Sequence, residues 1–256
     1  MKPFLTQQWQ ALWLGVGLLT RIPAPSLANA GNLAPGISLH WYFAVGLLIG
    51  LVLLALAHGF SALPFLAAAL VVAAWTWLTG GLHLDGLADC ADAWTGGMGD
   101  RMRTLAIMKD PACGPMGVAV VVLALLLKFA ALTTLLSFAV ATPWWLVPML
   151  ARAALPLVFI STPYVRPGGM GDRMAATCSP GFIYTSTVLT ILIVLMFTPL
   201  SLGLLWLSTT LLVLLGWRHA IMARLGGFTG DGAGALVEIL ETALLVVAAA
   251  AVAEAP

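Results

Sequence analysis

Long apolar stretches alternate with shorter polar stretches along this chain of 256 residues. A run of about 20 apolar residues can cross a bilayer as a helix, and backbone in lipid satisfies its hydrogen bonds only within helices or closed barrels. The apolar run Phe182–Leu215 is too long for one crossing, and Pro199 near its middle predicts a turn between two helices. We therefore predict seven spans, with approximate bounds His40–Phe60, Pro64–Leu82, Met116–Ser137, Pro143–Ile160, Phe182–Leu215 as a pair, and Ala235–Ala253.

The N-terminal segment Gln8–Thr20 is apolar but shorter than these runs, and it predicts an interfacial or re-entrant helix. With seven spans, the Lys and Arg residues fall on one side of the membrane, except Lys128 and Arg152, which lie inside spans. The positive-inside rule makes the charged side cytoplasmic. Four longer polar loops then face the cytoplasm, at residues 21–39, 83–115, 161–181 and 218–234. An eighth crossing by the N-terminal segment is the main alternative.

Composition supports the same class. Hydrophobic residues make up 61% of the chain and charged residues only 8%, whereas soluble domains are about one quarter charged. We expect an all-α, polytopic transmembrane bundle in which residues 1–256 form a single integral membrane domain. The net charge of +1 gives no electrostatic case for nucleic-acid binding, and the three cysteines do not have zinc-site spacing.

A first acidic cluster follows the second predicted span. Asp85, Asp89 and Asp92 are spaced i, i+4 and i+7, which places three carboxylates on one face of a helix. Like charges in this arrangement repel, and five of the ten acidic residues lie between residues 85 and 110 at a membrane boundary. A hard divalent cation would compensate the repulsion.

A second acidic cluster opens the last predicted span and echoes the first. In both clusters a glycine pair precedes an Asp-Gly step, and a carboxylate follows seven residues after that Asp: Asp92 follows Asp85, and Glu238 follows Asp231. Glu238 and Glu241 continue into an apolar helix, where an ionisable group is a functional hypothesis by default.

Together the two clusters predict one or two Mg²⁺ ions, because oxygen ligands favour such hard cations and paired metals can clamp phosphoryl oxygens. We therefore expect metal ligands among six carboxylates: Asp85, Asp89, Asp92, Asp231, Glu238 and Glu241. His83 is a candidate general base or phosphate contact, with a structural histidine as the alternative.

Several cations are candidates for binding phosphate oxygens. Arg152 stands inside an apolar span and needs a carboxylate or phosphate partner. Arg101 and Arg103 are explained equally well as anchors on the positive side of the membrane, and Arg21 taken alone fits a snorkelling anchor. Lys109 favours a functional role, because the Asp-Pro turn after it fixes the loop. The phosphate-binding candidates are Arg21, Arg101, Arg103, Lys109 and Arg152.

With these motifs in view, the chain resembles the cobalamin synthase (adenosylcobinamide-GDP ribazoletransferase) family over nearly its whole length. The most specific part of the resemblance is the segment His83-Leu84-Asp85-Gly86-Leu87-Ala88-Asp89. The other matching positions are Phe4-Leu5, Thr20-Arg21-Ile22-Pro23, Asp92, Lys109-Asp110-Pro111 with Gly114 and Gly117, Arg152, and Gly226-Gly227 through Asp231-Gly232 to Glu238.

The resemblance implies a Mg²⁺-dependent enzyme of the bacterial inner membrane, with its active site on the cytoplasmic side. Its substrates would be adenosylcobinamide-GDP and α-ribazole or α-ribazole 5′-phosphate. Its products would be adenosylcobalamin or the corresponding 5′-phosphate, and GMP. It implies catalytic or metal-binding roles for His83, Asp85 and Asp89. Its expected partners include a second copy of the chain or other enzymes of cobamide assembly.

Two other classes compete with this reading. The CDP-alcohol phosphotransferases also place an Asp-Gly motif at a membrane boundary, but the Ala-Arg that follows their Asp-Gly is absent here, where Ala88-Asp89 stands instead. An ion or vitamin transporter is the second competitor, although transporters more often carry polar groups at mid-membrane.

Overall fold

The computed structural model describes residues 2–25, 35–138 and 142–253, with only the backbone described for residues 2–4. Part of the predicted loop 21–39 and the side chain of Phe4 therefore lie outside the described residues. Within the described ranges the regular structure is helical apart from one isolated bridge between Tyr164 and Phe228. The helices are α1 (Lys2–Leu19), η2 (Pro35–Trp41), α2 (Tyr42–Gly59), α3 (Pro64–Thr79), α4 (Leu82–Gly96), α5 (Arg101–Ile107), α6 (Pro115–Ser137), η3 (Trp144–Leu146), α7 (Val147–Ser161), α8 (Met170–Thr177), α9 (Pro180–Phe197), α10 (Leu200–Leu225) and α11 (Gly230–Ala253).

Six helical segments in the described ranges are long and apolar enough to cross a membrane: η2 with α2, α6, η3 with α7, α9, α10 and α11. Helix α3 has only 16 residues, and it passes the same test only together with α4, from which it is bent by 87°. Each of the seven predicted spans therefore corresponds to a helix, and the predicted all-α transmembrane bundle is confirmed. The turn predicted at Pro199 is also found, because α9 ends at Phe197 and α10 begins at Leu200.

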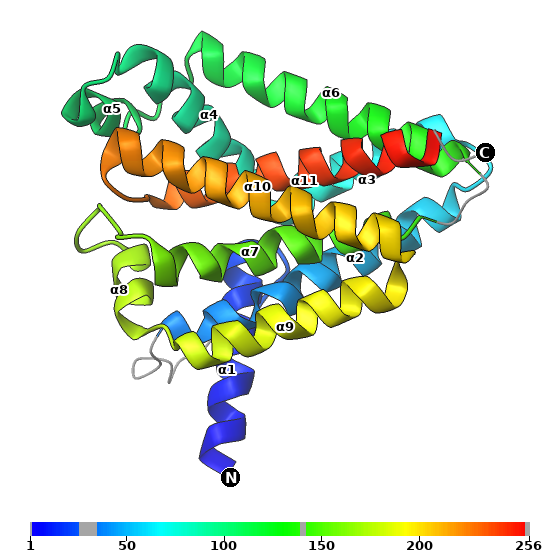
Figure 1. Ribbon diagram of the computed structural model, residues 1–256, viewed down its shortest axis with the longest axis horizontal. Coiled ribbons are helices and arrows are strands. Elements are labelled where there is room, and N and C mark those ends of the chain that lie inside the picture. Colours follow the sequence, from blue (N-terminus) through cyan, green and yellow to red (C-terminus); the bar gives the residue numbers. More distant parts are fainter. Residues whose placement is uncertain (1, 26–34, 139–141, 254–256) are drawn as a thin grey trace.

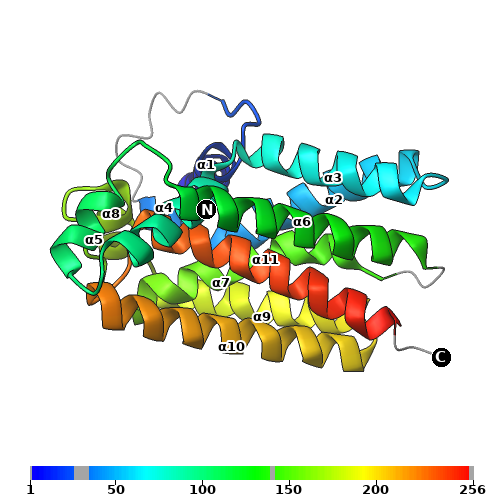
Figure 2. The same cartoon turned by 90° about the horizontal axis from the view of Figure 1, so that it is seen from above.

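The long helices run alongside one another, and the polar connections gather at one end of the bundle (Figure 1). Helices α4, α5 and α8 and the turn between α10 and α11 lie at this end, and the C-terminal end of α11 lies at the opposite end. Helix α1 crosses the direction of the long helices in Figure 1 and is seen nearly end-on in Figure 2. This orientation is the one expected for a helix lying in a membrane interface.

Three of the predicted cytoplasmic loops are largely helical in the structure. The range 83–115 contains α4 and α5, and the range 161–181 contains α8. The range 218–234 shrinks to the turn between Leu225 and Gly230. The reason is that polar residues also form helices, so a change from apolar to polar residues marks neither the end of a helix nor the absence of one.

Helices α7 and α11 form the centre of the bundle. In the most apolar 18-residue stretch of each helix, 67% of the residues are buried for α7 (with η3) and 61% for α11. The same fraction is 17% for both α9 and α10, so these two helices form an outer layer. Helix α11 contacts α4, α6, α7 and α10, which brings the second acidic cluster against the first.

Prolines and glycines set the helix boundaries that position the site. Pro64 and Pro115 occupy the first turns of α3 and α6, where a missing N–H costs nothing. Gly80 and Gly81 have φ angles of +64° and +69°, a left-handed conformation that residues with a side chain rarely adopt. These two glycines end α3 and redirect the chain by 87° into α4.

Candidate active site

Helices α4 and α11 cross closely at the polar end of the bundle, and two glycines make this approach possible. A Cβ atom at Gly86 would lie 2.6 Å from the backbone oxygen of Asp231, and one at Gly234 would lie 3.3 Å from the Cα atom of His83. The Asp-Gly step of the first cluster therefore packs directly on the Asp-Gly step of the second. The two similar sequence motifs are therefore in direct contact in the structure.

Three carboxylates gather at this crossing. Asp85 and Asp231 line a cavity of about 250 Å³ that is otherwise walled mainly by apolar side chains of α1, α7 and α8. Asp89 lies on α4, beyond the bend that ends α3. Burial, together with the negative charges of Asp231 and Asp85, raises the pKa of the Asp89 carboxyl to about 6. Repulsion among the three carboxylates is the signature of a site that a cation would stabilise.

Asp92, the third member of the first cluster, has a different partner. Its Oδ2 accepts a hydrogen bond from the backbone N–H of Gly114 at 2.7 Å, and its Oδ1 accepts one from Gly117 at 2.9 Å. A Cβ atom at either glycine would come within 2.5 Å of this carboxylate. Asp92 thus satisfies free N–H groups at the start of α6, as a capping residue does.

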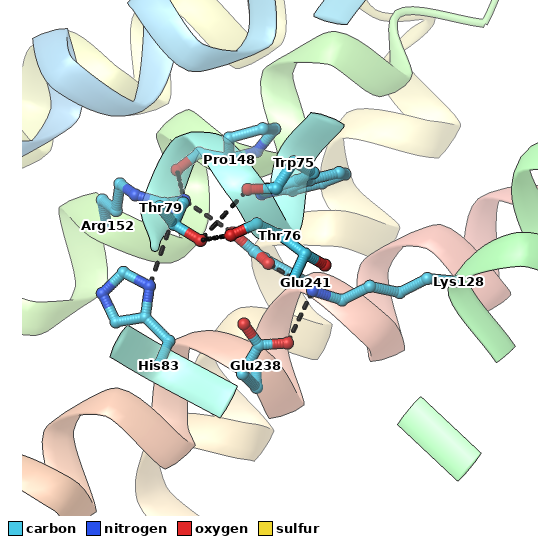
Figure 3. A network of polar contacts seen from close by, with 9 residues as sticks. All are labelled: Trp75, Thr76, Thr79, His83, Lys128, Pro148, Arg152, Glu238 and Glu241. Carbon is cyan, nitrogen blue, oxygen red and sulfur yellow. Dashed lines mark hydrogen bonds and ion pairs between the residues drawn. The ribbon is translucent and has the colours of Figure 1, made fainter. Parts of the chain in front are cut away.

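Glu238 and Glu241 lie deeper in the bundle, in a buried ion-pair network (Figure 3). Lys128 Nζ lies 2.7 Å from Glu238 Oε2 and 2.5 Å from Glu241 Oε2, and Arg152 Nη1 lies 2.5 Å from Glu241 Oε1. Lys128 Nζ also lies 4.8 Å from the centre of the Trp75 ring. Two cations and two anions balance, which is the condition under which charges are tolerated in a bundle interior.

The donor set fits magnesium in part. Within the described ranges no three acidic, histidine or cysteine side chains converge closely enough to hold a metal ion alone. Protein sites for Mg²⁺ commonly offer only one or two carboxylates and leave the other positions to water and substrate phosphates. Asp85, Asp89 and Asp231 can serve in that way, since their crossing lies beside a cavity. Asp92, Glu238 and Glu241 already have protein partners.

A cationic side chain, Arg166, faces the acidic crossing from the α7–α8 connection. Its Nη1 lies 2.7 Å from Asp231 Oδ2, and its Nη2 donates to the backbone oxygen of Met108 at 3.2 Å. The connection is tied to the turn before α11, because Val165 N–H donates to Phe228 O at 3.0 Å and Phe228 N–H donates to Pro163 O at 2.9 Å. These backbone bonds hold Arg166 in place.

A second cavity, of about 590 Å³, adjoins the first and shares Tyr164 with it. It lies between α5 and the α7–α8 connection, and its lining includes the cations Lys109 and Arg166. Burial raises the pKa of the Tyr164 phenol, so this group remains a hydrogen-bond donor near neutral pH. An acidic cavity and a cationic cavity therefore meet at Tyr164 and at the Arg166–Asp231 ion pair.

The structure places the five predicted phosphate-binding cations in different surroundings. Lys109 lines the second cavity, and exposed Arg21 packs against Gly80 beside the bend. Arg101 donates from Nε to the last carbonyl of α10, that of Leu225, at 2.7 Å. The two remaining candidates are exposed Arg103, at the same end as Arg101, and Arg152, which is fully buried with the Glu241 carboxylate as its partner.

Sequence reasoning assigned no role to Arg166, Tyr164 or Lys128. Lys128 carried a usable signal, because a lysine inside an apolar span requires a counter-charge. Arg166 and Tyr164 carried none, since nothing in the sequence separates Arg166 from the other cations of the polar loops. Their importance comes from the pairing of two distant turns.

The fold and this site define a polytopic helical membrane protein with an acidic site beside a cavity at one end of its bundle. The sequence matches the cobalamin-5-phosphate synthase family over residues 11–249, and the chain belongs to that family.

Curated relatives of this chain include enzymes named adenosylcobinamide-GDP ribazoletransferase. The Pseudomonas aeruginosa enzyme is 48% identical over 242 residues, which cover 93% of this chain and 96% of the relative. The Ectopseudomonas mendocina enzyme is also 48% identical, with 91% and 96% covered, and the Stutzerimonas stutzeri enzyme is 46% identical, with 92% and 96% covered. No solved structure matches this chain.

Proposed function

We propose that this chain is a Mg²⁺-dependent adenosylcobinamide-GDP ribazoletransferase. It joins adenosylcobinamide-GDP to α-ribazole or α-ribazole 5′-phosphate, and it releases GMP. Family membership and the names of close relatives support the transferase activity. The observation that carries the proposed site is the contact between Gly86 of α4 and Asp231 of α11, which joins the two acidic motifs beside a cavity.

The reaction replaces a phosphoanhydride bond with a phosphate ester. The 3′-hydroxyl of ribazole attacks the phosphorus that bears the cobinamide, and the bond from this phosphorus to the oxygen shared with GMP breaks. Both the attacked group and the leaving group carry negative charge, so catalysis depends on positioning and on charge stabilisation.

Asp85, Asp89 and Asp231 are our proposed magnesium ligands, because they crowd together at the α4–α11 crossing. A bound Mg²⁺ would neutralise the diphosphate and stabilise the leaving phosphate. The deeper carboxylates, Glu238 and Glu241, are satisfied by Lys128 and Arg152 and fit a supporting role better than a ligand role.

The second cavity suits the GDP portion of the substrate. Lys109 and Arg166 line it, and cations of this kind recognise phosphate oxygens. A substrate that spans both cavities would have its diphosphate close to Tyr164 and to the Arg166–Asp231 pair. The ribazole substrate would then enter from the first cavity.

We further propose that the site faces the cytoplasm across a bacterial inner membrane. The cations of α5, α8 and the end of α10 lie at the polar end of the bundle (Figure 1). The sequence of the turns at the opposite end, residues 60–63, 138–143 and 198–199, contains neither Lys nor Arg. This asymmetry is the one that the positive-inside rule associates with the cytoplasmic side.

The decisive experiment is GMP release by the purified protein in lipid nanodiscs, given adenosylcobinamide-GDP and α-ribazole with and without Mg²⁺. We expect release to require both substrates and the metal. Asp85→Asn, Asp89→Asn and Asp231→Asn should each lower kcat/KM by about 10²-fold or more, the scale of losing one charge-stabilising contact.

Asp100→Asn is the matched control, because Asp100 is an exposed carboxylate at the same end and caps α5 through Arg103 N–H. Asn caps helices as well as Asp does, so the control should keep full activity. GMP release that continues without Mg²⁺, or full activity in all three site variants, would refute the proposed site.

A further inference from the structure

His83 lies where the acidic crossing meets the buried ion-pair network. It is the second residue of α4, directly after the bend at Gly80 and Gly81, and its side chain is buried. The close approach of Gly234 brings α11 against the His83 backbone. Because the His83 side chain is buried, the packing around it restricts the orientation of the ring.

The partner of one ring nitrogen determines where the proton sits. Arg152 Nη2 lies 3.5 Å from His83 Nδ1 (Figure 3). A guanidinium group has only N–H donors and stays charged in proteins. Nδ1 must therefore present its lone pair to Arg152, because an N–H at this position would face another N–H and a positive charge. In a neutral imidazole the proton is then on Nε2.

Arg152 is itself fixed on both sides. Its Nη1 donates to Pro148 O at 3.1 Å and to Glu241 Oε1 at 2.5 Å. The other oxygen of Glu241 accepts from Lys128, which also binds Glu238. The network spans α6, α7 and α11, so the orientation of the guanidinium toward His83 is determined by the packing of three helices.

The other ring nitrogen, Nε2, is buried and has no hydrogen-bond partner among the described residues. Figure 3 shows it on the side of the ring that faces away from the network. His83 also lines the 250 Å³ cavity, together with Asp85 and Asp231. A buried donor without a partner costs free energy, and an oxygen atom of a ligand in this cavity would satisfy it.

We infer that His83 donates a hydrogen bond from Nε2–H to a phosphoryl oxygen of the substrate, and that it does not act as a general base. Arg152 and Glu241 are positioning residues that hold this tautomer. The identity of the ligand rests on the proposed function, whereas the tautomer rests on the network alone. A preorganised donor of this kind stabilises charge that develops on the transferred phosphoryl group.

The first test compares side chains that can donate but cannot act as a base. The amide nitrogen of Gln lies about as far along the side chain as Nε2 of His, so His83→Gln should keep kcat within about tenfold of wild type, while His83→Ala should lose about 10²- to 10³-fold. His219→Gln, at an exposed histidine, is the matched control. Equal and large losses in His83→Gln and His83→Ala, with both proteins folded, would overturn the donor role.

The second test does not depend on turnover. Protein labelled with ¹⁵N-histidine is examined by NMR, and the His83 signals are those missing from His83→Gln. We expect a neutral ring protonated on Nε2. A ring protonated on Nδ1 would refute the inference whether or not GMP is released, so failure of the inference and failure of the proposed function are distinguishable.

The positioning role has its own variant. Arg152→Gln combined with Glu238→Gln keeps the network neutral and offers Nδ1 an amide that can either donate or accept. We expect both tautomers of His83 in this protein. A spectrum identical to that of the wild type would show that Arg152 does not determine the tautomer.

Discussion

The buried network makes a quantitative prediction for Lys128→Met. The substitution removes one of two cations and leaves Glu238 and Glu241 with Arg152 alone, so the cluster gains an uncompensated negative charge. The side chains of Lys128 and Glu238 are 5% exposed and that of Glu241 is fully buried, so solvent cannot screen this charge. Breaking a buried ion pair from one side costs about 3–5 kcal/mol. For a domain of this size, that corresponds to a fall in Tm of about 10 °C.

The measurement is thermal unfolding in detergent, followed by tryptophan fluorescence. Lys128→Met combined with Glu238→Gln restores neutrality and should recover most of the lost stability. Lys109→Met removes an exposed lysine and should change the free energy of unfolding by no more than about 0.5 kcal/mol. A Lys128→Met protein within about 1 kcal/mol of wild type, or a double variant no more stable than the single one, would refute the charge-balance argument.

Three further predictions follow from the site. Asp92→Ala removes both acceptors from the start of α6 and should cost about 1–2 kcal/mol of unfolding free energy, with Asp92→Asn costing less; equal losses would argue against capping. Gly86→Ala places a methyl group 2.6 Å from Asp231 O, so it should cost about 1–3 kcal/mol and lower GMP release, whereas Gly216→Ala, with open space around it, should be tolerated. Because the pKa of Asp89 is raised to about 6, protons should compete with Mg²⁺ for this carboxylate, and the affinity of the protein for Mg²⁺ should fall as the pH drops through 6. Titration calorimetry at several pH values measures this affinity, and an affinity that does not change with pH would exclude Asp89 as a ligand.

Most of the fold could be predicted because hydropathy reports directly on membrane crossing. The turn at Pro199 was predictable for the same reason, since a proline divides an apolar run too long for one span. The extent of α10 was not predictable: it continues through Arg218 and Arg224 to Leu225, where Gly226 adopts a left-handed φ of +71°. The residues after the apolar core still favour a helix. Hydropathy reports where the chain is apolar and does not report where a helix ends.

Most residues of the site could be predicted from the sequence, but the contacts between them could not. The i, i+4, i+7 spacing correctly places Asp85, Asp89 and Asp92 on one helix. It could not show that Asp92 turns to the start of α6, because that contact depends on two glycines more than 20 residues away. Likewise, Lys128 and Glu241 stood out as single charges in apolar runs, but their pairing joins positions 113 residues apart.

Charge balance explains why carboxylates from the same two motifs have different roles. In the deep network, Lys128 and Arg152 neutralise Glu238 and Glu241, so it has no net charge to attract an ion. At the polar end, three carboxylates face one cation, Arg166, so their formal charges leave two negative charges in excess.

That excess equals the charge of one divalent cation, and it lies beside a cavity open to a substrate that carries phosphates. The neutral network below holds His83 at the edge of the same cavity. In the proposed site, the deep residues contribute orientation and the residues at the crossing contribute charge. The two functions remain separate because α11 places Glu238 two helical turns, about 10 Å, below Asp231.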